Sequence, residues 1–167
     1  MSTLLAFVSV LLAATPGASQ APYSRAVEQG VSHGFKDCAP ALDRYVRSIE
    51  KDDTDYAHVG IWDKGSPNRH AFHTITSDRS GNNVAITAFS AAKNVAGGCD
   101  VAAIQILHVS MTCAEFRETV GKKWRFYSAL GGSSAYKSPD SDGVMVILSD
   151  VSGGHCLLVK QTLEFNG

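Results

Sequence analysis

The sequence carries almost no net charge. Its 167 residues include 15 Lys and Arg against 16 Asp and Glu, a formal net charge of −1. A protein that binds nucleic acid mainly through the phosphates needs a basic surface, so we do not expect nucleic acid as the main partner. The same balance gives no support for binding to an anionic membrane.

Several catalytic motifs are missing as well. There is no G-x-S-x-G nucleophile elbow, and neither glycine pair (97–98 or 131–132) precedes a helix start with Lys-Ser or Lys-Thr. Two carboxylate pairs, at 52–53 and at 140 and 142, lie in polar stretches where solvation is their simplest role. No catalytic set is identified and no cofactor is predicted.

Cysteine is scarce, and its spacing is informative. The four cysteines are Cys38, Cys99, Cys113 and Cys156, and none forms the close C-x-x-C pair typical of metal sites. An even number of cysteines in an exported chain is typical of disulfides. We therefore predict two disulfides and no metal.

Geometry limits how these cysteines pair. Residues 101–109 read as a strand, so Cys99 and Cys113 would lie roughly 30 Å apart at its two ends. A disulfide needs Cα atoms within about 7 Å, which disfavours Cys99–Cys113. Two patterns remain, and Cys38–Cys99 with Cys113–Cys156 is favoured over Cys38–Cys113 with Cys99–Cys156.

The first residues indicate export. Leu4 to Ala14 is an almost unbroken apolar run, which suits a signal peptide and is too short to span a membrane of about 30 Å. Small, helix-breaking residues follow at 15–21, although no Lys or Arg precedes the run. We predict a signal peptide over 1–21, a single domain over 22–167, no membrane span, and a secreted or periplasmic location.

Helical periodicity is clearest early in the predicted domain. Apolar residues recur at steps of three or four between Val27 and Ile49, interrupted by Pro40. Two interpretations remain open: one kinked helix, or a second helix that starts near Asp37 with Pro40 in its first turn. Both place Cys38 on the buried side.

The rest of the chain reads mainly as strands. Alternating segments near 57–62, 69–76 and 83–91 predict an antiparallel meander, because their links are too short for crossover helices. Thr112 and Glu115 fit a capping box at the start of a short helix. Further strands are expected at 101–109, 124–129, 144–148 and 156–165. The prediction is an α+β fold, with an antiparallel sheet of about six to seven strands and no internal repeat.

Six histidines invite a catalytic or metal interpretation. His70 and His73 would point to opposite faces of a strand, although His58 could lie beside one of them across the first hairpin. His155 adjoins Cys156, but an oxidised cysteine is no nucleophile. A small secreted hydrolase that uses His58, His70, His73 or His155 is therefore one alternative function.

Two loops suggest binding instead. The first, 62–69, carries Trp62, Asp63 and Arg69, and the second, 131–143, carries Tyr136 and Lys137 among flexible residues. Aromatic and Arg side chains often anchor protein interfaces. We predict an exported binding protein with a protein partner, such as an inhibitor or immunity protein. A structural subunit of an envelope assembly is the other alternative.

Overall fold

A computed structural model describes residues 23–50, 57–80 and 83–165 of the chain. The predicted signal peptide therefore lies outside the described residues. None of the helices in the described part is long and apolar enough to cross a membrane.

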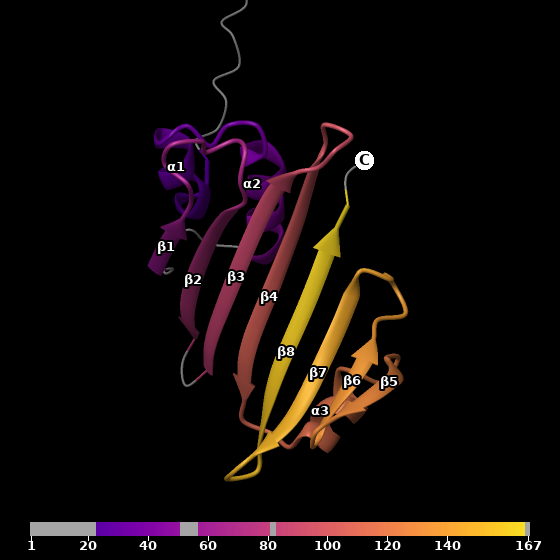
Figure 1. The fold of residues 1–167 in the computed structure, drawn as a ribbon. Coiled ribbons are helices and arrows are strands. Elements are labelled where there is room, and N and C mark those ends of the chain that lie inside the picture. The colour runs from indigo at the N-terminus through magenta and orange to yellow at the C-terminus, as the bar shows by residue number, and fades with distance from the viewer. Residues whose placement is uncertain (1–22, 51–56, 81–82, 166–167) are drawn as a thin grey trace, which may run out of the picture.

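The described residues form three helices and one sheet of eight strands (Figure 1). This confirms the predicted α+β class, with a slightly larger sheet than expected. The elements are α1 (Arg25–Ser32), α2 (Ala39–Ile49), β1 (Ala57–Ile61), β2 (Phe72–Ser80), β3 (Asn83–Lys93), β4 (Cys99–Val109), α3 (Cys113–Thr119), β5 (Arg125–Leu130), β6 (Ser133–Lys137), β7 (Val144–Val151) and β8 (His155–Glu164).

The strands follow the order β1-β2-β3-β4-β8-β7-β6-β5, and every neighbouring pair is antiparallel. Strands β1 to β4 form one meander, and β5 to β8 form a second. The last strands of the two meanders, β4 and β8, pair with each other. A single continuous sheet results.

All three helices lie on the same face of this sheet. Helices α1 and α2 pack on β1 to β4, and they lie behind the sheet in the view of Figure 1. Helix α3 packs on β7 and β8. Cys156 of β8 is paired with Val109 of β4, and paired residues point to the same face of a sheet. Val109 in turn points to the same face as Val101 and Ala103, which lie under α2. The face that α3 covers is therefore the face that α2 covers. We call this the helix face.

The fold repeats one arrangement, although the sequence shows no repeat. In each half a helix precedes a four-stranded meander: α2 with β1–β4, and α3 with β5–β8. In each half a disulfide joins the start of the helix to the start of the fourth strand. Each half also has its own buried cluster, one beneath α1 and α2 and one beneath α3. An approximate two-fold axis between β4 and β8 relates the two halves.

The helix boundaries follow from local chemistry. Pro40 occupies the first turn of α2, where a missing N–H costs nothing, so the two-helix interpretation is confirmed. In α1, a Cβ atom at Gly30 would lie 2.5 Å from Cε2 of Phe72, so only glycine lets the helix approach β2 this closely. The predicted capping box of Thr112 and Glu115 is present. Its backbone hydrogen bond at Thr112 lowers the pKa of Glu115.

The prediction of a long polar loop over 131–143 is wrong. Residues 133–137 form β6, an interior strand between β5 and β7. Gly131 and Gly132 have φ angles of 53° and 95°, and together they form the two-residue turn between β5 and β6. Such a turn needs positive φ at both positions, so the glycine pair marks a hairpin here. The polar residues that follow it concealed the strand.

Both disulfides have the favoured pairing. Cys38 bonds to Cys99 with a Cα–Cα distance of 5.5 Å, and Cys113 bonds to Cys156 with a distance of 4.8 Å. They close segments with sequence separations of 61 and 43 residues. Each therefore restricts the unfolded chain within one half of the fold.

Replacing either disulfide by a pair of alanines is expected to cost about 2–4 kcal/mol of unfolding free energy. Because the two closed segments are similar in length, the two losses should agree within about 1 kcal/mol. Urea unfolding of the two double variants measures these losses. Hydrogen exchange should then show faster exchange mainly in the half that lost its disulfide. Uniform acceleration across both halves would contradict two local cores.

Candidate functional site

The face of the sheet opposite the helices is the main candidate site. Side chains alternate along each strand, so the register places one set of residues away from the helices. We call the following set the open face: Val59, Ile61, Ile75, Ile86, Ala88, Ser90, Ala102, Ile104, Ile106, Met145, Ile147, Leu157, Val159, Gln161 and Leu163. Among the described residues, no helix covers it.

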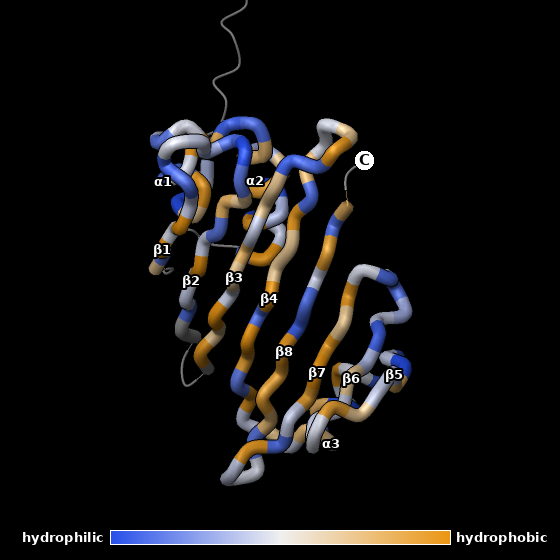
Figure 2. Tube along the Cα trace, in the orientation of Figure 1, coloured by the Kyte–Doolittle hydropathy of each residue, from blue (hydrophilic) through white to orange (hydrophobic). Residues whose placement is uncertain are grey.

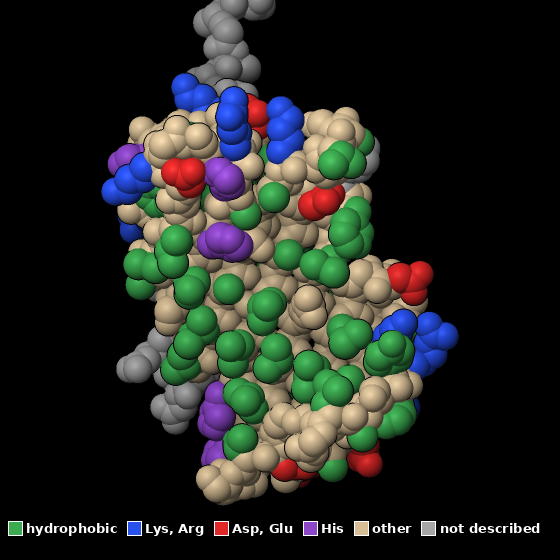
Figure 3. Space-filling model, in the orientation of Figure 1, with side chains coloured by type: hydrophobic (Ala, Val, Ile, Leu, Met, Phe, Trp, Pro, Cys, Tyr) green, Lys and Arg blue, Asp and Glu red, His purple; other side chains and the backbone are tan. Residues whose placement is uncertain are grey.

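The open face is apolar and accessible. Ile61 is 63% exposed and Ile104 is 42% exposed, although both lie within an ordered sheet. Figure 3 shows hydrophobic side chains gathered across the middle of this face, with most charged groups toward its margins. An exposed apolar patch of this kind is typical of an interaction site.

A shallow groove runs across the open face. Its floor consists of the small residues Ala88, Ser90 and Ala102 on β3 and β4, and Ile75 and Ile104 stand beside it. The hollow has a volume of about 400 Å³. Two adjoining hollows, of about 200 and 290 Å³, continue it past Leu163 and Phe165 toward Met145. Small side chains between larger ones therefore create a place where apolar groups can insert.

Ionisable groups lie at the margins of this face. Asp100, at the start of β4, accepts a hydrogen bond of 3.0 Å from Nδ2 of Asn94. The exception is His73, which lies on this face between Ile61 of β1 and Ser90 of β3 and lines the groove. At the other end of β4, the rings of His108 and His155 lie 4.9 Å apart. Apart from His73, the residues that line the groove carry no formal charge.

Part of β7 and part of β8 are apolar on both sides of the sheet. Val144–Leu148 is a continuous apolar run, and Leu157–Val159 is another, as the hydropathy along these strands shows (Figure 2). An antiparallel strand with one solvated face normally alternates between apolar and polar residues. A continuous run is typical of strands buried on both faces, yet the helices cover only one. This run is the sequence signal that could have identified the open face.

The first predicted binding loop, 62–69, lies near one edge of the sheet. Trp62 is half-buried: its ring centroid is 5.6 Å from that of Phe72 and 5.1 Å from that of His33. Asp63 and Arg69 are exposed, and Asp63 lies 3.4 Å from Nε2 of His70. Trp62 thus contributes to packing, whereas Asp63 and Arg69 are exposed to solvent.

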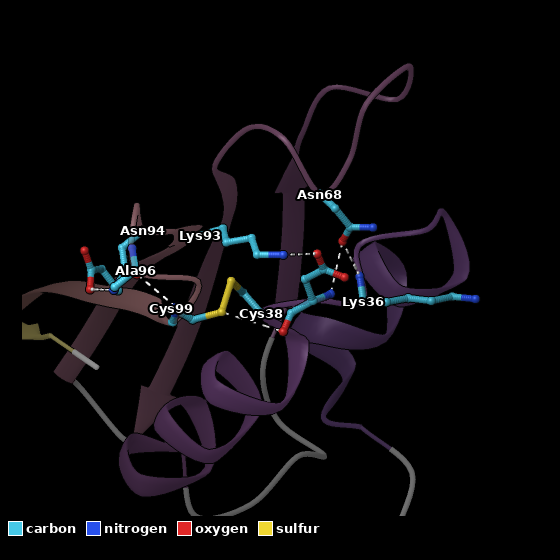
Figure 4. The surroundings of a disulfide bond; sticks show 10 residues. Lys36, Cys38, Asn68, Lys93, Asn94, Ala96 and Cys99 are labelled. Carbon is cyan, nitrogen blue, oxygen red and sulfur yellow. Dashed lines mark hydrogen bonds and ion pairs between the residues drawn. A yellow bond between two sulfur atoms is a disulfide. The ribbon is translucent and has the colours of Figure 1, made fainter. Parts of the chain in front are cut away.

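Asn68 holds this loop in place (Figure 4). Its Oδ1 accepts hydrogen bonds from the amides of Lys36, at 2.8 Å, and Asp37, at 3.1 Å. Its Nδ2 donates to the carbonyl of Gly34, at 3.0 Å. One side chain therefore joins the loop to the segment between α1 and α2, next to the Cys38–Cys99 disulfide.

The other predicted binding residues lie on β6. Tyr136 is on the helix face, where the Arg117 guanidinium lies 5.0 Å from its ring centroid. Lys137 shares the open side with Met145, and its Nζ lies 4.5 Å from the Tyr127 ring. In the sheet, β6 is five strands from β2, a spacing of about 24 Å. The structure therefore does not bring Tyr136 and Lys137 together with the 62–69 loop.

The candidate histidines are spread over the molecule. His58 lies on the helix face opposite Thr76, His70 lies by Asp63, and His73 lies on the open face beside Ser90. His155 lies at the far end of β8 beside His108. In the part of the chain that the structure describes, no three His, Cys, Asp or Glu residues gather as metal ligands.

Comparisons with protein-family models, curated proteins and solved structures gave no significant match for this chain. The function proposed below is therefore argued from the geometry of the site.

Replacing Asn68 by alanine removes all three hydrogen bonds between the 62–69 loop and the α1–α2 segment. We expect a loss of about 1–2 kcal/mol of unfolding free energy, together with faster hydrogen exchange at the amides of Lys36 and Asp37. The matched control Asn68→Asp keeps the acceptor for those two amides and should retain most of their protection. Equal exchange in wild type and both variants would show that Asn68 does not hold the loop.

Proposed function

We propose that this chain is an exported binding protein whose open face is the docking surface for a protein partner. The observation that carries the proposal is an accessible, largely apolar face on a sheet whose other face is covered by helices. Soluble proteins gain free energy when apolar surface is buried, and the largest apolar patch on a protein surface is often an interaction site.

The size of the face supports docking. The open face spans six strands and about five residues along each, which by strand spacing gives roughly 500 Å². The largest apolar patch on a typical monomer is about 300–600 Å², and such patches often mark interaction sites. A partner that covered the open face would remove this area from water in one step.

The groove supports a partner with protruding apolar side chains. Binding energy in protein interfaces concentrates in a few anchors that fill well-packed pockets. The floor of Ala88, Ser90 and Ala102 leaves room for such anchors between the larger side chains. Because the floor belongs to paired strands in the interior of the sheet, the groove is preformed and little conformational entropy is lost on binding.

Export is the second part of the proposal. Two disulfides fit an oxidising compartment, because thiols in the cytosol are kept reduced. The apolar run at 4–14 supports a cleaved signal peptide and a secreted or periplasmic location. The narrower role of an inhibitor or immunity protein depends on the identity of the partner, which the following experiment determines.

Placing the photo-crosslinking residue p-benzoylphenylalanine at Ile104 should yield a crosslinked product when the producing cells are irradiated, because Ile104 lies at the centre of the docking surface. The same residue at Glu28, an exposed position on α1, is the control and should give little product. Mass spectrometry of the product identifies the partner. Equal crosslinking at both positions, or none at Ile104 in correctly folded protein, would refute the proposed docking surface.

A further inference from the structure

We propose that the partner on the open face is a second copy of this chain, packed face to face about a two-fold axis. The inference rests on the proposed function, since it names the occupant of the same surface. In this arrangement two sheets form a sandwich with the helices of both copies outside. Three features of the open face favour a second copy: its area, its lack of charge and its relief.

The area matches what a stable dimer needs. The apolar centre alone, at roughly 500 Å² per copy, gives about 1,000 Å² for the pair, which is the lower limit expected of a biological interface. Strands β2, β3, β4, β8 and β7 are 8 to 11 residues long, so contact along their full length extends this area. With these five strands at about eight residues each and β1 at five residues, each copy would contribute roughly 700 Å².

The lack of charge removes the usual obstacle to self-association. In a two-fold interface the same patch faces itself, so any charged residue near the axis meets its own copy. Like charges placed opposite one another strongly oppose association. Near the centre of the open face, the polar residues are Ser90, its neighbour His73 and Gln161. Ser90 and Gln161 are neutral, and all three side chains can form hydrogen bonds to their counterparts. Asp100 lies away from the centre, at the end of β4.

The open face has protruding side chains beside a recess, so its shape can complement that of a second copy. Ile104 and Ile106 protrude from β4, while Ala88 and Ser90 on β3 form the neighbouring groove floor. In a two-fold sandwich, the protruding residues of one copy lie across the groove of the other. Packed sheets keep their strands within about 30° and lie about 10 Å apart, a spacing that these side chains fill.

The runs in β7 and β8 agree with a sandwich. In the single chain, Met145, Ile147, Leu157 and Val159 are only partly buried, although they belong to continuous apolar segments. Strands with continuous apolar segments are normally buried on both faces. A second copy on the open face would supply the missing cover.

Sedimentation velocity of the purified mature protein, over a concentration series, tests the proposal. We expect a reversible dimer with a dissociation constant of about 1 μM or tighter, the range for interfaces of this size.

Ile104→Lys should weaken association about 100-fold, because two lysines would meet near the axis. Gln161→Glu adds the charge with almost no change of shape and should weaken it at least about 10-fold at neutral pH. The control Glu28→Gln should leave the dimer unchanged, and circular dichroism confirms that each variant is folded.

Several outcomes would overturn the proposal. Dimerisation that neither Ile104→Lys nor Gln161→Glu weakens would place the interface elsewhere. A wild-type protein that stays monomeric at high concentration, but whose Ile104 position crosslinks to a different protein, would refute the second copy and leave the proposed docking function standing. A monomer that instead floats with phosphatidylcholine vesicles, and loses this property in Ile104→Lys, would show that the face binds lipid and would refute both proposals.

Discussion

The antiparallel pairing of β4 with β8 holds this molecule together. Nine residue pairs, from Val101–Glu164 to Val109–Cys156, join two meanders that are far apart in sequence. Without this pairing each half would be a four-stranded sheet with two unpaired edges, which is a template for aggregation. With it, a single eight-stranded sheet forms, all helices lie on one side, and the other side becomes a continuous surface.

The two halves on either side of this pairing are built alike. Each places one disulfide between the start of its helix and the start of its fourth strand, so the covalent links are local to a half. The buried cluster beneath α1 and α2 is larger than the one beneath α3. The pairing of β4 with β8 is thus the main connection between two compact units, and it sets the relative position of the residues that form the open face.

The open face depends on this connection for its function as well as its existence. Its groove floor comes from β3 and β4, whereas Gln161, Leu163 and Met145 come from β8 and β7. Docking therefore requires both halves in register. A shift of β8 by one residue would turn Gln161 and Leu163 toward the helices and expose Lys160 and Thr162 in their place.

The sequence alone indicated several local elements, because these depend on near neighbours: the capping box of Thr112 and Glu115, the first meander and the inward-facing cysteines. It left open whether Pro40 kinks one helix or lies in the first turn of a second, which the structure decided. It also favoured the correct disulfides: strand length disfavours a bond between Cys99 and Cys113, and of the two patterns that remain the correct one was preferred. It missed β6, whose residues are polar, and it did not predict the repeated halves, which share a topology without a visible motif. Only the tertiary structure decided that β4 pairs with β8 and that Trp62 packs on Phe72. The open face was likewise decided there, because which side of a strand the helices cover depends on contacts between residues distant in the chain.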